Sequence, residues 1–124
     1  MDQKDKYSIN LNAAYGPLQR IDVNATAQSV SDPWFNQTLC GVNDCVVRLG
    51  VFKGGEFHWH KHDKEDEFFF VLSGRFVVET EGERTELRPH QGLLVPRGVM
   101  HKTSAPEPSV ILMMEGATVK PTGD

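Results

Sequence analysis

The stretch from Gly54 to Gly74, GGEFHWHKHDKEDEFFFVLSG, holds three of the five histidines of the chain, placed at every second position. Four carboxylates follow within five residues, and an aromatic run comes directly after them. Side chains at alternate positions of a β-strand point to the same face, about 6.6–6.8 Å apart. Two imidazoles at that spacing can meet on one ion, so the stretch is either a polar strand with a solvated turn or half of a metal site.

The spacing of the histidines leaves two pairs open. His60 and His62 satisfy the two-residue condition, and so do His58 and His60, whereas all three span about 13 Å, too far for one ion. If the next strand folds back, Glu67 lies beside His60 and His62 and faces an apolar interior, where a carboxylate is costly unless it is paired or binds a metal. Glu65 could replace Glu67 only if that strand began two residues earlier.

A third imidazole is available from His101, at the end of the sequence Pro96-Arg97-Gly98-Val99-Met100-His101. The Pro-x-Gly turn would direct a following side chain inward. Histidines combined with a carboxylate suit Fe(II), Mn(II), Ni(II), Zn(II) or Cu(II), and they leave coordination positions for water or substrate.

Short apolar segments separated by Gly and Pro turns run through the chain, which predicts an all-β sandwich or barrel. The expected strands are Cys45–Phe52, Phe68–Leu72, Arg75–Thr80, Leu93–Val95 and Val110–Met114. The second and the last are apolar at every position, so both of their faces should be covered. Another sheet of the same barrel or a second subunit could supply the second cover, and we expect a homodimer.

The length of 124 residues and the composition, 39% hydrophobic, predict one domain over residues 1–124. We expect residues 1–30 to form an arm that includes a short helix or an edge strand, and residues 119–124 to fray. Cys40 and Cys45 enclose a turn, and reduced thiols are favoured there over a cross-strand disulfide or a zinc site.

The charge and hydropathy of the chain limit the classes of partner that it can bind. The net charge of −4 argues against a nucleic-acid or anionic-membrane surface, which would need a basic excess. The first residues lack the apolar stretch of a secretory signal, and no run approaches the roughly 18 apolar residues of a membrane span. We therefore expect a cytoplasmic protein that binds neither nucleic acid nor membrane.

The spacing of these motifs resembles that of the cupin superfamily. The first cupin motif (Gly, five residues, His-x-His, three or four residues, Glu, six residues, Gly) is matched by Gly54, His60, His62, Glu67 and Gly74, and the second by Pro96, Gly98 and His101. The chain departs from the family in having His90-Gln91 in place of Gly-Asp, and Ala105 in place of Asn. The resemblance covers about Val46–Met114.

By this resemblance, the fold is a small jelly-roll, or double-stranded β-helix, barrel with its motif core at 46–114. The resemblance also implies that His60, His62, Glu67 and His101 hold one divalent metal ion per chain, with Fe(II) or Mn(II) favoured and Ni(II), Zn(II) or Cu(II) as alternatives. His58 lies outside the motif and would then form a pocket wall or contact a ligand residue, with a role as a metal ligand as the less favoured alternative.

A centre of this kind indicates a metal-dependent enzyme that acts on a small polar or anionic substrate by isomerase, lyase or dioxygenase chemistry. The alternative is a non-catalytic cupin that binds metal or a small ligand as a sensor or storage module, which a filled or closed barrel would favour. The candidates for substrate binding are Arg48, His58, Phe69 and Arg97, although Arg48 could equally form a structural ion pair. Glu65 and His58 are weak candidates for a general base.

Overall fold

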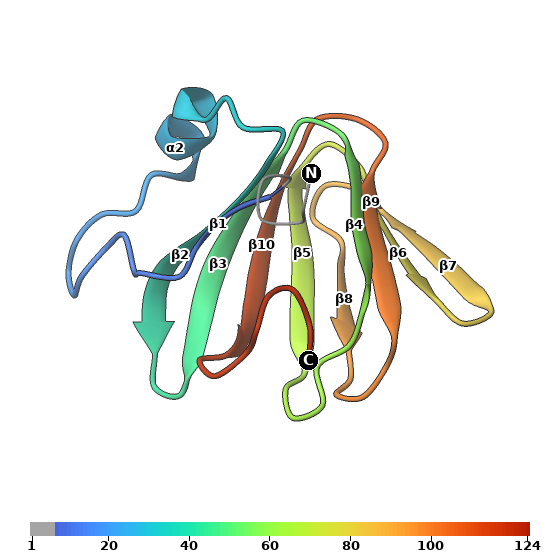
Figure 1. Ribbon diagram of the computed structural model, residues 1–124. Helices are drawn as coiled ribbons and strands as arrows, with labels where there is room; N and C mark the ends of the chain where they lie inside the picture. The colour runs from blue at the N-terminus through green and yellow to red at the C-terminus, as the bar shows by residue number, and fades with distance from the viewer. Residues whose placement is uncertain (1–6) are drawn as a thin grey trace.

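Figure 1 shows the computed structural model of the chain, which describes residues 7–124. The elements in chain order are β1 (Ser8–Asn10), α2 (Val23–Ser29), β2 (Trp34–Val42), β3 (Cys45–Phe52), β4 (Gly55–His60), β5 (Glu67–Ser73), β6 (Phe76–Thr80), β7 (Glu83–Leu87), β8 (Gly92–Val95), β9 (His101–Ala105) and β10 (Ser109–Gly116). The dominance of strands confirms the all-β prediction.

The strands form two sheets, whose members can be followed by their labels in Figure 1. One sheet has the strand order β1-β2-β3-β10-β5-β8, and the other has the order β4-β9-β6-β7. Neighbouring strands pair antiparallel, except that β1 runs parallel to β2. This arrangement is the small jelly-roll barrel that the sequence predicts.

The apolar segments of the sequence identified five of the strands. The predicted range Cys45–Phe52 coincides with β3, and the other four predicted ranges overlap β5, β6, β8 and β10. The strand β7, with the sequence ERTEL, was not predicted because it is mostly polar. It pairs with β6 at one edge of its sheet, where side chains need not be apolar.

The main hydrophobic core lies between the two sheets and is largely aromatic. Trp34 of β2 stacks on Phe52 of β3 with ring centroids 3.8 Å apart. In β5, Phe69 and Val71 are buried in this core, whereas Phe68 is 38% exposed on the opposite face. The apolar side chains of β5 therefore point alternately into the core and onto the outer face of the sheet.

A second cluster covers the outer face of β2 and β3. Leu39, Leu49 and Val51 are buried there against apolar residues of the N-terminal arm and of α2. The helix begins after Asp22, whose side chain accepts a hydrogen bond of 3.0 Å from the Ala25 N–H, as an N-cap residue does. Residues 1–6 of the expected arm lie outside the described residues, and between residues 7 and 30 both expected structures occur, since β1 is an edge strand and α2 is a short helix.

The end of the chain packs onto the barrel, whereas its composition suggested a frayed tail. Val119 is only 8% exposed, and the Asp124 N–H donates a 2.9 Å hydrogen bond to the carbonyl oxygen of Lys61. These contacts are made largely by the backbone, so the side-chain sequence gives no sign of them.

Within residues 7–124, no helix has the length and apolar character needed to cross a membrane. Cys40 and Cys45 are free thiols. They are not cross-strand partners, because Cys40 lies opposite Val47 and Cys45 lies opposite Val42 in the β2–β3 hairpin.

Candidate metal centre

A β-bulge in β4 decides which histidines face the interior. In the pairing of β4 with β9, Phe57 lies opposite Thr103 and His60 lies opposite His101, so β4 has one extra residue between these pairs. Phe57 and His60 are consequently both buried, although they are three positions apart. His58 falls within the bulge, and this interrupts the two-residue alternation that the sequence suggested.

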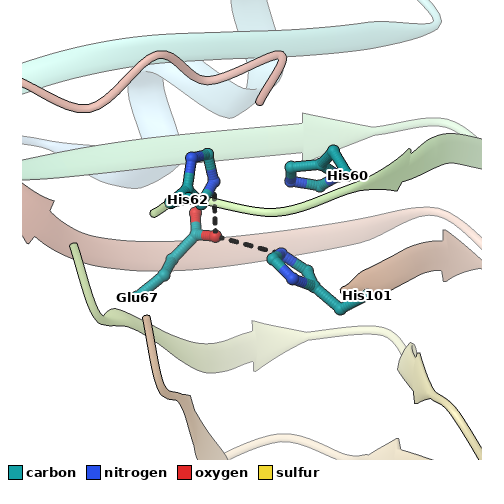
Figure 2. Close-up of side chains that lie close together, drawn as sticks. All are labelled: His60, His62, Glu67 and His101. Carbon is teal, nitrogen blue, oxygen red and sulfur yellow. Dashed lines mark ion pairs between the residues drawn. The ribbon is translucent and has the colours of Figure 1, made fainter. Parts of the chain in front are cut away.

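Four buried side chains lie close together in the barrel (Figure 2). His60 ends β4, His62 lies in the following connection, Glu67 begins β5 and His101 begins β9. All four residues are buried, and each offers a nitrogen or oxygen atom within 4.8 Å of those of the others. Glu67 Oε1 lies 3.4 Å from His62 Nε2 and 3.5 Å from His101 Nε2.

The Pro-x-Gly turn before β9 connects two of these side chains. The Val99 N–H donates to the Pro96 carbonyl oxygen at 3.3 Å, and Gly98 has φ +79°, a conformation that favours glycine. The Gly98 N–H then donates a 2.8 Å hydrogen bond to the carbonyl oxygen of His62. The turn thus fixes the backbone of His62 and also directs His101 into the site.

Backbone carbonyl groups orient two of the imidazole rings. The Nδ1–H of His60 donates to the His58 carbonyl oxygen at 2.9 Å, and the Nδ1–H of His101 donates to the Val99 carbonyl oxygen at 2.9 Å. In the neutral ring, a proton held on Nδ1 by these bonds leaves the Nε2 atom available as a ligand. Such bonds commonly fix the tautomer and orientation of metal-binding histidines.

The polar atoms at the centre of this group fit a divalent metal ion. His62 Nε2, His101 Nε2 and Glu67 Oε1 are buried and have no hydrogen-bond partner among the described residues. Buried polar atoms are normally hydrogen-bonded, and leaving several unpaired in one place is costly unless a ligand satisfies them. Three imidazoles and a carboxylate are a donor set for first-row divalent metals.

The electrostatics of the site favour the protonation states that metal binding requires at His60 and Glu67, whereas they favour the protonated ring at His62. Burial lowers the pKa of His60 to about 4, because it disfavours the charged imidazolium. Burial acts to raise the pKa of Glu67, but the adjacent imidazoles of His101 and His62 outweigh it and hold this pKa well below its ordinary value. Burial acts to lower the pKa of His62, but the adjacent Glu67 carboxylate outweighs burial and raises it.

A buried polar network extends from Glu67 into the sheet that contains β2, β3, β10 and β5. Glu115 of β10 lies directly opposite Glu67 of β5 and shares a hydrogen bond with it. Burial, together with the charge of Glu67, raises the pKa of Glu115 to about 10, so Glu115 is the proton donor in that bond at neutral pH. Arg48 Nε lies 3.4 Å from Glu115 Oε1, and the same guanidinium donates to Thr38 Oγ1 and Asn36 Oδ1.

A small cavity of about 20 Å³ adjoins two of the four side chains, His60 and Glu67. Its lining comprises Trp34, Asn36, Phe52, Phe57, His60, Glu67, Phe69, Phe76, Thr103, Met113 and Pro121. A space of this size holds about one water molecule. The walls are mainly aromatic, and polar groups reach the cavity from the two metal-site residues and from Asn36 and Thr103.

Three polar residues of the site were not predicted from the sequence. Thr103 lies two positions after His101, so strand alternation could have placed it on the same inward face. Glu115 likewise lies two positions after the buried Met113, where a charged residue in an apolar strand is a detectable signal. Asn36 belongs to β2, a strand that the sequence analysis did not identify.

Of the other residues predicted to bind substrate or act as a base, one lines the cavity and three have protein partners elsewhere. Phe69 lines the cavity, whereas Arg48 is 1% exposed and its guanidinium is bound by protein groups, an arrangement that favours a structural role. Arg97 is largely exposed and pairs with Asp66 at 3.4 Å. Glu65 accepts a 3.1 Å hydrogen bond from the Thr118 hydroxyl and, like Arg97, does not line the cavity.

His58 lies beside the centre but outside the four-residue group. Its ring stacks on Phe57 with ring centroids 4.4 Å apart, and it is 5.4 Å from the ring of His60. The Nε2–H of His58 donates to the Thr122 carbonyl oxygen at 2.6 Å. The residue therefore contacts the C-terminal segment of the chain. Trp59, the next residue in the bulge, is 47% exposed.

The fold and the site define a small β-barrel protein with a buried three-histidine, one-glutamate group. The Cupin domain family matches residues 47–115, which is more than half of the chain, and the chain belongs to that family. The matched region contains all four members of the group.

Similar proteins agree with this assignment. The uncharacterized protein YdbB of Bacillus subtilis (strain 168) is 37% identical over 92 residues, which is 73% of this chain and 80% of that protein. The crystal structure of a cupin-2 domain containing protein from Shewanella frigidimarina NCIMB 400 is 28% identical, with a TM-score of 0.72, and the match covers 77% of this chain and 93% of that one. The structure of KdgF from Halomonas sp. is 26% identical, with a TM-score of 0.65, over 74% of this chain and 87% of that one.

Proposed function

We propose that the protein is a metal-dependent enzyme that acts on a small polar or anionic substrate. The observation that carries this proposal is the set of four buried ligand atoms within 4.8 Å of one another, several of them without a hydrogen-bond partner among residues 7–124. We propose Fe(II) or Mn(II) as the metal, and isomerase, lyase or dioxygenase chemistry as the reaction class.

A divalent ion held by three neutral imidazoles and one carboxylate would supply a Lewis acid of net charge near +1, which attracts anionic oxygen atoms. The residues around it exclude water and orient what binds. The rings of Phe57, Phe69 and Phe76 form apolar walls. Because Asn36 Oδ1 accepts from Arg48, the Asn36 amide group keeps its N–H donors for a bound molecule.

In this proposal, Arg48 acts through Asn36 and Glu115 and does not contact the substrate. The Thr103 hydroxyl is a second group that can hydrogen-bond to a molecule in the cavity. Phe69 remains a substrate-contacting candidate as part of the wall. Glu65 and Arg97 have partners outside the cavity, so we assign neither of them to the substrate.

The metal content of the purified protein tests the proposal. We expect about one divalent ion per chain by elemental analysis, either as purified or after reconstitution with Fe, Mn, Ni or Zn salts. His101→Ala should weaken metal binding by more than about 100-fold, because loss of even an outer partner of a ligand typically costs 10–100-fold. His90→Ala, in an exposed turn, is the matched control. A wild-type protein that takes up no metal would contradict the proposal.

A second candidate function is a non-catalytic cupin that stores or senses a metal or a small ligand. The small size of the cavity, about 20 Å³, favours this alternative, because it leaves little room for a substrate. Mass spectrometry of any small molecule that co-purifies can separate the two functions. A binding protein should take that molecule back unchanged, whereas an enzyme should release it in altered form.

We also propose that the protein is a homodimer. The outer face of β5 and β10 bears a groove of about 320 Å³ lined by Val47, Phe68, Phe70, Leu112, Met113 and Met114, all of them apolar. The N-terminal arm covers the outer face of β2 and β3 but leaves Phe68 and Met114 38% and 46% exposed. A second copy packed on this face would cover these side chains.

A cytoplasmic location and the absence of nucleic-acid binding complete the proposal. The free thiols of Cys40 and Cys45 suit a reducing compartment. The net charge of −4 does not suit a polyanionic partner.

A further inference from the structure

Residues 117–124 form a segment that packs beside the metal centre. This tail segment, residues 117–124, follows β10 and returns toward the connection between β4 and β5, as the red end of the ribbon in Figure 1 shows. Two turns shape it, with hydrogen bonds from the Val119 N–H to the Gly116 carbonyl oxygen at 3.0 Å and from the Gly123 N–H to the Lys120 carbonyl oxygen at 2.8 Å.

Three hydrogen bonds attach the tail segment to the part of the chain that carries His60 and His62. The Asp124 N–H donates to the Lys61 carbonyl oxygen at 2.9 Å, and the Asp63 N–H donates to Asp124 Oδ2 at 2.6 Å. The His58 Nε2–H donates to the Thr122 carbonyl oxygen at 2.6 Å. The residues that receive the tail segment therefore alternate with the two histidine ligands along the sequence.

The tail segment also touches the metal centre itself. Gly123 approaches His60 so closely that a Cβ atom on Gly123 would lie 2.6 Å from the Cβ atom of His60. Its φ of +99° is likewise a conformation that side chains rarely adopt. Pro121 lines the cavity together with His60 and Glu67. One wall of the cavity thus belongs to the tail segment.

This wall limits what can reach the metal centre. The cavity beside His60 and Glu67 measures about 20 Å³, which is room for about one water molecule or one end of a slender anion, so a wider group does not fit while Pro121 is in place. Apart from Val119, the residues of the tail segment are exposed or only partly buried. A segment with so little buried surface has a low free energy of local opening compared with the barrel.

We propose that the tail segment is a lid that determines ligand size at the metal centre, with Pro121 as the size-limiting residue and His58 and Asp124 as its attachments. When the lid is seated, only water and slender anions reach the metal. When it is displaced, a wider carboxylate can bind. This inference rests on the proposed metal site, and it assigns to His58 the role of holding the lid.

Two anions of equal charge and different width test the lid on protein loaded with Co(II). Azide is slender and benzoate is wide, and the binding of each can be followed by the visible absorption of the cobalt centre. Asp124→Ala removes an attachment without touching a metal ligand, and Gly123→Ala prevents the lid from seating against His60. Gly82→Ala is the control, because Gly82 also has a positive φ, +82°, but has no atom within 4 Å of the added Cβ.

We expect azide to bind the wild type and all three variants with dissociation constants within twofold of one another. Benzoate should bind Asp124→Ala and Gly123→Ala at least tenfold more tightly than it binds the wild type and Gly82→Ala. Equal benzoate affinity in all four proteins would overturn the lid, and so would a parallel change for both anions, which would indicate a disturbed metal centre. Azide that perturbs the cobalt spectrum of none of them would also overturn it. A wild type that takes up no Co(II) would instead refute the proposed metal site.

Discussion

Replacing Glu115 by Gln should stabilise the metal-free protein at neutral pH. Glu115 is 3% exposed, and the burial and the nearby charge of Glu67 raise its pKa to about 10 from an ordinary value of 4.5. The folded protein therefore holds a proton on Glu115 at pH 7 that the unfolded chain has released. A Gln side chain has nearly the same shape, can accept from Arg48 and can donate to Glu67, but it takes up no proton on folding.

The magnitude follows from the linkage between proton binding and folding. A group whose pKa is raised in the folded state contributes its full stability below the unfolded pKa and loses it as the pH rises toward the folded pKa. The free energy of unfolding contributed by Glu115 thus falls by about 1.4 kcal/mol per pH unit above 4.5. At pH 7 the accumulated loss is about 3 kcal/mol, and Glu115→Gln should avoid it.

Urea denaturation of the metal-free wild type and of Glu115→Gln, measured between pH 4.5 and 8, checks this reasoning. The stability difference should be near zero at the lowest pH and should grow to about 3 kcal/mol in favour of Gln at pH 7. Glu81→Gln, in the exposed turn between β6 and β7, controls for the loss of one negative charge. A Gln variant that is equally stable or less stable than the wild type at every pH would show that Glu115 is ionised in the folded protein.

Three further predictions concern the metal, the outer face and a motif glycine. Metal affinity should rise with pH, by up to about tenfold per unit below the raised pKa of His62, because a proton on His62 competes with the metal; calorimetry in two buffers measures the protons released. Phe68→Lys should convert the proposed dimer to a monomer in sedimentation experiments. Gly74→Ala should destabilise the protein by about 3 kcal/mol in urea, because the added Cβ at φ +83° would lie 2.3 Å from the Pro108 carbonyl oxygen.

Each of these three predictions has a control and a contradicting result. Metal affinity that is constant between pH 5 and 8 would contradict the competition with His62. Leu18→Lys, at an exposed position, should leave the oligomeric state unchanged, and a Phe68→Lys variant with the wild-type sedimentation coefficient would contradict the dimer face. Gly82→Ala, at a similar φ but in open space, should lower the free energy of unfolding by only about 1–2 kcal/mol. An equal loss for Gly74→Ala would show that the structure shifts to relieve the contact with the Pro108 carbonyl oxygen.

Much of the fold and the composition of the metal group could be predicted from local sequence patterns. Short apolar runs predicted five of the strands. Two of these runs are apolar at every position, as expected for a strand that is covered on both faces. His60, His62 and Glu67 lie within a few residues of one another, so their spacing carries most of the geometry. The Pro96-x-Gly98 turn could be recognised because proline and glycine are the residues that favour the backbone conformations of a turn. The turn indicated that the side chain of His101 points inward.

The remaining parts of the site depend on contacts between distant residues. The bulge that separates His58 from the ligands depends on how β4 pairs with β9, and no local pattern shows the pairing register. Asn36 and Glu115 become neighbours of the centre only when β2, β3 and β10 align in one sheet. The tail segment is held mainly by backbone groups, which every residue has, so its side chains give no indication of its position.

The distribution of the four metal-site residues between the two sheets has a consequence for folding. Glu67 belongs to the sheet of β5, whereas His60 and His101 belong to the sheet of β4 and β9. An ion held by all of them is a cross-link between the two halves of the barrel, in a chain whose two thiols are not joined. The unfolded chain cannot bring these residues together, so the metal binds only the folded state. The free energy of unfolding therefore rises with metal concentration, by about 2.7 kcal/mol at one hundred times the dissociation constant. The barrel would then resist opening between its sheets in proportion to the supply of metal.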